Sequence, residues 1–109
     1  TLAEDLPDQS KEILRNWIGG TPSEMEEAYR KASPLTYVSP GDAPMLLLQG
    51  TKDPLIPTTQ AYVMVEALTQ AGVPGRVELL IGAGHGWGDP LELKRSLEVT
   101  HAFLEERLR

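Results

Sequence analysis

The sequence contains no cysteine, which excludes disulfide bonds and thiolate metal sites. Positive charge is also scarce: ten Lys and Arg stand against sixteen Asp and Glu, giving a formal net charge of −6. Such a chain lacks the basic surface that binds nucleic acid or anionic membranes. Its longest apolar run, PMLLLQG (44–50), is far shorter than the roughly 20 residues of a membrane-spanning helix. We therefore expect neither a nucleic-acid partner nor a membrane partner.

The N-terminal segment TLAEDLPDQSKE lacks the basic and apolar regions of a signal peptide, and the first residue is Thr1 rather than methionine. We expect this end to result from processing or truncation, so the compartment stays open. The 109 residues are 40% hydrophobic and 24% charged, which suits one globular domain with a modest core.

The first third of the chain is predicted to be helical. PDQSKEILRNWIGG (7–20) can be capped by Asp8 or Ser10 and is stopped by two glycines. TPSEMEEAYRKASP (21–34) begins with a capping box formed by Thr21 and Glu24, and its final proline ends the helix. LTYVSPGDAP (35–44) is expected to be a loop. We interpret residues 1–34 as a helical lead-in or the remnant of a lid.

Residues 35–109 predict a strand–helix–strand–helix unit. MLLLQG (45–50) has no polar alternation, which favours a strand covered on both faces, and RVELLI (76–81) predicts a second strand. TTQAYVMVEALTQAG (58–72) predicts the helix between them, with an inner face made of Ala61, Met64, Val65 and Leu68. This order builds a parallel sheet with right-handed connections. Because two parallel strands leave both edges open, we expect an incomplete α/β sheet.

The last helix is expected to follow directly, over DPLELKRSLEVTHAFLEERLR (89–109). Asp89 stands at its N-cap, Pro90 at its first position and Glu92 at the capping-box position. Spacing of three and four residues predicts an inner stripe composed of Leu93, Leu97, Thr100, Leu104 and Leu108.

Two polar residues follow the two predicted strands. Asp53 lies in TKDPLIP, and His85 lies in IGAGHGWGDP among four glycines at 82, 84, 86 and 88. The loops that leave the carboxyl ends of parallel strands meet at one edge of the sheet. We therefore expect Asp53 and His85 to be neighbours, with the carboxylate fixing the tautomer of the imidazole and leaving its other nitrogen free as a base.

These motifs resemble the C-terminal part of an α/β-hydrolase. The pattern H-G-x-x-D-P-L-[IV]-P is matched as QGTKDPLIP, and GAGHG follows the next strand. The similarity covers about residues 30–109. It is greatest to the bacterial esterase and lipase branch that includes feruloyl- and acetyl-esterase-like enzymes, with prolyl-oligopeptidase-type domains close by. The resemblance implies that Asp53 is the triad acid, that His85 is the triad base, and that no cofactor or metal is needed.

The nucleophile of that family is missing from this chain. It lies in G-x-S-x-G, and none of the five serines (10, 23, 33, 39 and 96) has that context. The H-G-G-G oxyanion loop is absent as well. We expect the 109 residues to be the C-terminal fragment of a longer serine hydrolase acting on a small ester, with the isolated chain inactive. Hydrolysis of a peptide bond is the second choice.

Other readings of single residues remain open. Asp42 and Asp89 compete as the acid, but Asp42 precedes the strand and Asp89 can cap the last helix. Trp87 lines a substrate pocket or packs against the sheet. His101 falls on the last helix without metal-ligand partners at usable spacing.

Two other functions remain as alternatives. A free Thr1 could act as an N-terminal nucleophile. The chain could also be a non-catalytic, hydrolase-derived module that self-associates or binds a partner. In either a fragment or a module, we expect the open sheet edge to be covered by the missing N-terminal half or by another copy, so a homo-oligomer is favoured.

Overall fold

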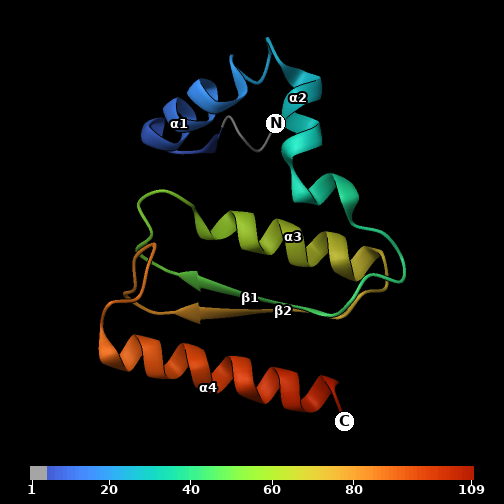
Figure 1. The fold of residues 1–109 in the computed structure, drawn as a ribbon, viewed down its shortest axis with the longest axis vertical. Coiled ribbons are helices and arrows are strands. Elements are labelled where there is room, and N and C mark those ends of the chain that lie inside the picture. The colour runs from blue at the N-terminus through green and yellow to red at the C-terminus, as the bar shows by residue number, and fades with distance from the viewer. Residues whose placement is uncertain (1–4) are drawn as a thin grey trace.

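The computed structural model describes residues 5–109, which form a parallel two-stranded sheet and its flanking helices (Figure 1). None of the helices within these residues combines the length and the hydropathy that a membrane-spanning segment requires. Thr1, the candidate N-terminal nucleophile, lies outside the described residues. In chain order the elements are α1 (Asp8–Ile18), α2 (Glu26–Ala32), the 3₁₀ helix η2 (Pro34–Tyr37), β1 (Met45–Gly50), α3 (Thr58–Gln70), β2 (Gly75–Leu80) and α4 (Pro90–Arg107).

The sheet is the α/β unit that the sequence predicts. β1 and β2 pair in parallel from Met45 opposite Gly75 to Gly50 opposite Leu80, and α3 connects them. β1 has the predicted bounds, whereas β2 begins and ends one residue earlier than predicted. Both strands point the same way, so the loops after β1 and β2 both leave the sheet at the carboxyl ends of the strands (Figure 1).

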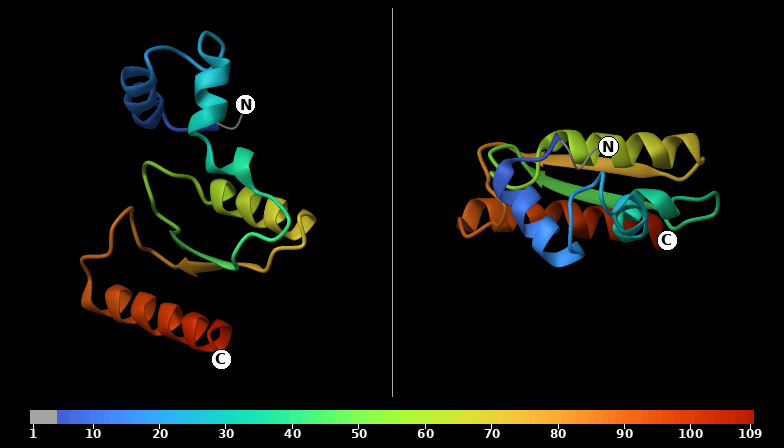
Figure 2. Two further views of the ribbon diagram at one scale, coloured as in Figure 1. Left: turned by 45° about the vertical axis from the view of Figure 1, so that its right-hand side comes forward. Right: turned by 90° about the horizontal axis from the view of Figure 1, so that it is seen from above.

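Two helices enclose the sheet from opposite sides, α3 on one and α4 on the other (Figures 1 and 2). Leu68 of α3 is fully buried, and it packs so closely over Gly75 that a Cβ atom there would lie 2.9 Å from its Cδ1. Nevertheless, Leu46, Leu47 and Leu48 of β1 are only half-buried, so the prediction of a strand covered on both faces is too strong. The reason is that each strand has a free edge within the described chain.

The predicted inner stripe of α4 is wrong. The buried residues of this helix are Ser96, Val99 and Phe103. They lie about 100° around the helix from the leucine stripe, because each residue turns an α-helix by about 100°. Four members of the predicted stripe are exposed and the fifth, Thr100, is half-buried; the exposed members are Leu93, Leu97, Leu104 and Leu108.

α1 begins without a side-chain cap, so the prediction that Asp8 or Ser10 caps it is wrong. Pro7 occupies the N-cap, and Ser10 lies inside the helix with its hydroxyl donating elsewhere. Gly19 ends α1 in the left-handed conformation (φ 102°), as predicted. α1 and α2 lie at the end of the long axis opposite α4 (Figure 2).

The capping box of the second helix forms, but it closes a turn and not the helix. Thr21 and Glu24 exchange both predicted hydrogen bonds, from Thr21 N to Glu24 Oε1 (3.1 Å) and from Glu24 N to Thr21 Oγ1 (3.3 Å). Met25 then leaves the helical region (φ −125°, ψ 43°), so α2 starts only at Glu26. The predicted loop after it also contains the 3₁₀ helix η2.

Candidate active site

Asp53 occupies a tight turn directly after β1. Its Oδ1 accepts hydrogen bonds from the backbone N–H groups of Leu55 (2.8 Å) and Ile56 (2.9 Å). This arrangement is an Asx turn, in which a short carboxylate replaces a backbone acceptor. The side chain is 7% exposed, and its second oxygen, Oδ2, is directed away from the turn.

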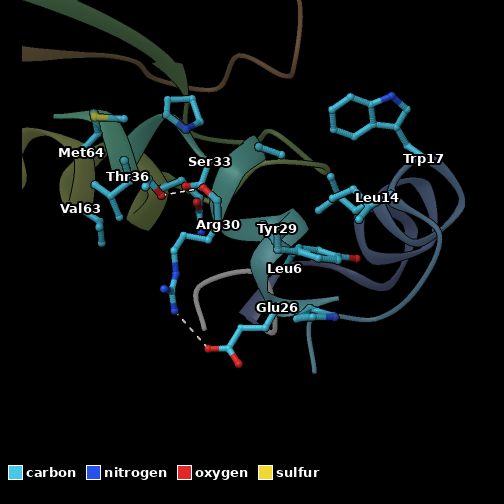
Figure 3. A pocket seen from close by; sticks show the side chains of 16 residues that line it. Leu6, Leu14, Trp17, Glu26, Tyr29, Arg30, Ser33, Thr36, Val63 and Met64 are labelled. Carbon is cyan, nitrogen blue, oxygen red and sulfur yellow. Dashed lines mark hydrogen bonds and ion pairs between the residues drawn. The ribbon is translucent and has the colours of Figure 1, made fainter. Parts of the chain in front are cut away.

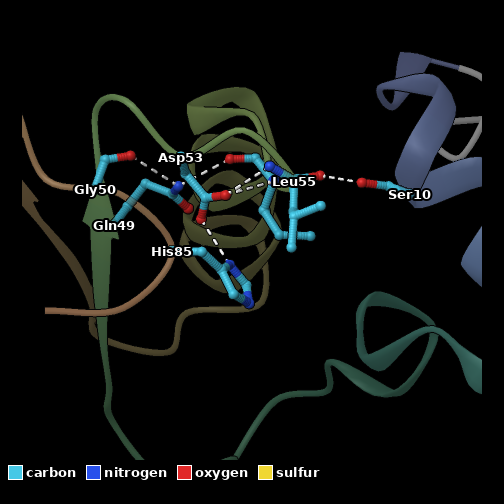
Figure 4. A network of polar contacts seen from close by, with 7 residues as sticks. Ser10, Gln49, Gly50, Asp53, Leu55 and His85 are labelled. Atoms are coloured by element: carbon cyan, nitrogen blue, oxygen red, sulfur yellow. Dashed lines mark hydrogen bonds and ion pairs between the residues drawn. The ribbon is translucent and has the colours of Figure 1, made fainter.

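His85 lies opposite this carboxylate, in the loop that follows β2. Its Nδ1 is 2.9 Å from Asp53 Oδ2 (Figure 4). The structure therefore brings together the two residues whose proximity the sequence predicts. Because an ionised carboxylate can only accept, Nδ1 carries the shared proton. His85 is 57% exposed, and its Nε2 has no partner among residues 5–109.

Two hydrogen bonds join the loop of Asp53 to the loop of His85, one between backbone groups and one to a side chain. Lys52 N donates to Ala83 O (2.8 Å), and Gly82 N donates to Thr51 Oγ1 (2.7 Å). Gly50 allows this approach: a Cβ atom there would lie 2.2 Å from Gly84 O. Sequence reasoning missed Gly50 and Thr51, although both stand where β1 meets the loop.

The glycines around His85 contribute less than the sequence suggests. Gly82 needs to be glycine, because its φ is +83°. Cβ atoms at Gly84, Gly86 and Gly88 would meet no heavy atom within 4 Å in the described chain.

The environment of Asp53 favours its ionised form. Burial opposes ionisation, but hydrogen bonds from the Ile56 N–H, from His85 and from the Leu55 N–H outweigh it, with a further attraction to the His85 charge. Together they hold the pKa of Asp53 below its ordinary value of 3.8. A buried anion that contacts one nitrogen of an exposed imidazole can orient the ring and stabilise its protonated form.

The remaining candidates of the sequence lie elsewhere. Asp42 accepts from Ser39 N (2.8 Å) before β1, and Asp89 caps α4 through Leu91 N (2.8 Å), so neither competes for His85. His101 is exposed on α4, 3.8 Å from Glu105. Within residues 5–109 no cluster of three metal-ligating side chains occurs.

Trp87, two residues after His85, is half-buried. Its indole Nε1 is buried without a hydrogen-bond partner in the described chain. A buried donor of this kind is unusual and costs stability, unless another molecule or chain supplies the acceptor. Its assignment to a substrate pocket stays a prediction.

All five serines lie within residues 5–109, and in this described part of the chain none of them hydrogen-bonds to His85. Ser10 and Ser96 are buried and donate to Leu55 O and Leu93 O. Ser39 is bound to Asp42 and Ser23 to Thr21. The geometry therefore contains an acid and a base, but no serine placed as their nucleophile.

An apolar pocket of about 370 Å³ lies between α1, α2, η2 and α3 (Figure 3). Trp17 and Leu14 of α1 line one side, and Met64 of α3 lines another. The charged residues at its rim, Glu26 and Arg30, pair with each other (3.3 Å). Its surroundings therefore suit an uncharged, apolar group.

The sequence matches the BD-FAE family of α/β-hydrolase esterases over residues 2–68, more than half of the chain. The chain belongs to this family. The matched segment contains Asp53, while His85 lies beyond it.

Two curated relatives of this BD-FAE chain are an esterase and a peptidase by name. Esterase LipC of Mycobacterium tuberculosis is 38% identical over 79 residues, which are 71% of this chain and 19% of that protein. Dipeptidyl aminopeptidase BIII of Pseudoxanthomonas mexicana is 32% identical over 107 residues, which are 98% of this chain and 14% of that protein.

The fold is shared with a solved structure, the propionate-bound esterase Est2 of Thermogutta terrifontis. The TM-score is 0.67 at 28% identity, and the alignment covers 92% of this chain and 36% of the esterase. This likeness confirms the predicted α/β-hydrolase portion. The BD-FAE chain thus spans about a third of that esterase and less than a fifth of the two curated relatives.

Proposed function

We propose that this chain supplies the acid and the base of a Ser-His-Asp triad that hydrolyses carboxylic esters. The contact between His85 Nδ1 and Asp53 Oδ2 at 2.9 Å carries the proposal. It combines a buried, ionised carboxylate with an exposed imidazole whose Nε2 is unoccupied within the described chain. Membership of the BD-FAE family and the names of the relatives support hydrolysis as the chemistry.

In the proposed mechanism, His85 Nε2 removes the proton from a serine hydroxyl as its oxygen attacks the ester carbonyl. Asp53 holds the ring in position and stabilises the imidazolium that forms. His85 then returns the proton to the leaving alcohol. In the second half-reaction, His85 takes a proton from water as its oxygen attacks the acyl-enzyme. The bond to the serine oxygen then breaks, the carboxylic acid leaves, and His85 returns the proton to the serine.

The serine of this triad comes from sequence outside these 109 residues. All five serines of the chain lie outside a G-x-S-x-G motif, and none hydrogen-bonds to His85. We therefore expect the 109-residue chain alone to have little or no hydrolase activity. A fluorophosphonate probe, which labels activated serines, should leave it unmodified, and rapid labelling of one of its serines would contradict this expectation.

An ester is favoured over a peptide bond as the substrate. The solved esterase carries propionate, a short carboxylic acid of the kind that ester hydrolysis releases. Peptide hydrolysis is the second candidate, because one relative is a dipeptidyl aminopeptidase. Comparing an uncharged short-chain ester with a dipeptide anilide as substrates of the complete enzyme separates the two.

The test of the proposed function is hydrolysis of 4-nitrophenyl acetate by the complete enzyme and its His85→Ala variant. We expect this variant to lose at least about a thousandfold in kcat, because the serine loses its base. His101→Ala is the matched control, since it removes the other histidine at an exposed position and should leave the rate unchanged. An unchanged rate in His85→Ala would refute the proposal.

A further inference from the structure

Gln49, the second-to-last residue of β1, is buried beneath the loop that carries Asp53 and bridges its two ends. Gln49 is 8% exposed, and its Nε2 donates to Gly50 O (3.1 Å) and to Ile56 O (3.0 Å) (Figure 4). Carbonyl oxygens only accept, so both N–H groups of this amide are used. One side chain thereby joins the two ends of loop 50–56, with Asp53 at its middle.

Ser10 forms another hydrogen bond to the same loop. This residue lies in α1, 45 positions before its partner, and its side chain reaches across to the loop (Figure 4). Its hydroxyl donates to Leu55 O at 2.5 Å, and the residue is only 6% exposed. Serine side chains in helices commonly hydrogen-bond to nearby backbone groups of the same helix. The Ser10 hydroxyl instead connects α1 to the loop of Asp53.

The two anchors, Ser10 and Gln49, bind the two residues whose N–H groups orient the acid. Asp53 Oδ1 accepts from the N–H groups of Leu55 and Ile56. The carbonyls of those same two residues accept from Ser10 and Gln49. Fixing them therefore fixes the direction of Oδ2, the oxygen that faces His85.

We propose that Gln49 and Ser10 are positioning residues of the active site, which hold loop 50–56 so that Asp53 Oδ2 meets His85 Nδ1. This inference rests on the proposed function. It differs from a stabilising role, because the two residues act through Asp53. Displacement of a catalytic group by about 1 Å can cost two orders of magnitude in rate.

The kinetic test uses Gln49→Met, which removes both donors, and Ser10→Ala, which removes one hydroxyl. In the complete enzyme we expect each to lower kcat for 4-nitrophenyl acetate by about tenfold or more, with KM nearly unchanged. In an Asp53→Asn background neither should lower kcat further. Gln49→His, which keeps a side-chain N–H donor, should recover part of the loss. Equal losses in both backgrounds, or no loss in either, would overturn the proposal.

An NMR titration tests the same inference without activity. The ¹³C signal of the Asp53 carboxyl reports its ionisation in the complete enzyme. In Ser10→Ala and Gln49→Met the midpoint should move up toward the ordinary value of 3.8, because the turn hydrogen bonds weaken. An unchanged midpoint in both variants would contradict the positioning role. If Gln49→Met does not fold, Ser10→Ala decides the result.

The two proposals fail in different ways. If hydrolysis does not depend on His85, the proposed function is wrong, and the titration still shows whether the anchors hold Asp53. If hydrolysis depends on His85 and Asp53 but Ser10→Ala and Gln49→Met act equally in both backgrounds, only the positioning inference is wrong.

Discussion

Gly50 lies so close to Gly84 that a Cβ atom at position 50 would be 2.2 Å from the carbonyl oxygen of Gly84. Backbone atoms on both sides form this contact, so no side-chain rotation relieves it. This contact lies where the loop that carries Asp53 packs against the loop that carries His85. The spacing between the proposed acid and base therefore depends on a residue that takes part in no chemistry.

We expect Gly50→Ala to separate the two loops. The added methyl group must displace backbone, and overpacking of this kind costs about 1–3 kcal/mol of the free energy of unfolding. Urea denaturation followed by circular dichroism measures this loss. Gly86→Ala is the matched control, because its Cβ atom would meet no heavy atom within 4 Å. Equal stability of the two variants would show that the close approach is not required.

The stability of the chain should depend on pH through Asp53. Its pKa is lowered on folding, so the stabilisation is complete above the ordinary value of 3.8 and is lost as the pH falls through the folded-state value. The difference in free energy of unfolding between the wild type and Asp53→Asn should therefore shrink as the pH falls below about 4, where the Asp53 carboxylate becomes protonated. A difference that does not shrink between pH 5 and 3 would contradict the assignment.

The burial pattern of α4 and α3 predicts which leucines stabilise the chain. Leu68→Ala, at a fully buried position, should cost about 2–5 kcal/mol of the free energy of unfolding. Leu97→Ala, at a position 62% exposed, should change it by about 0.5 kcal/mol or less. Denaturation at low protein concentration compares the two. Similar losses would mean that the leucine stripe of α4 is buried after all.

Much of the fold could be predicted from sequence because the decisive signals are local. The apolar run 45–50, the glycine that ends α1 and the Asp89 cap each act within a few residues. Burial in α4 could not be predicted in the same way. The helix carries apolar residues on two adjacent faces, and the sheet, not the periodicity, selects the face with Val99 and Phe103.

The proposed acid and base could also be predicted, because Asp53 and His85 follow two parallel strands and must emerge at one edge. The residues that hold them could not. Ser10 reaches Leu55 across 45 residues, and Thr51 accepts from Gly82 across 31, so neither contact leaves a local pattern. From the sequence, Ser10 is expected to cap α1 by accepting from a backbone N–H of that helix. In the structure its hydroxyl donates to Leu55 O instead.

We propose that the free edge of β1 is covered in the working protein, by a strand from outside these 109 residues or by a second copy of the chain. Within the described residues β1 pairs only with β2, and an unpaired edge exposes backbone donors and acceptors. Hydrogen exchange should therefore show protected β1 amides in the complete protein or in an oligomer. A monodisperse monomer in which the β1 amides not bonded to β2 exchange freely would contradict this.

The central claim is that Asp53 acts through His85, and a double-mutant cycle on ester hydrolysis tests it most directly. In the complete enzyme we expect Asp53→Asn to lower kcat by up to about ten-thousandfold, because the imidazole loses its orientation and charge partner. Combining Asp53→Asn with His85→Ala should lower kcat no further than His85→Ala alone. A double variant whose loss is the product of the two single losses would show that the two residues act independently, and would contradict the account.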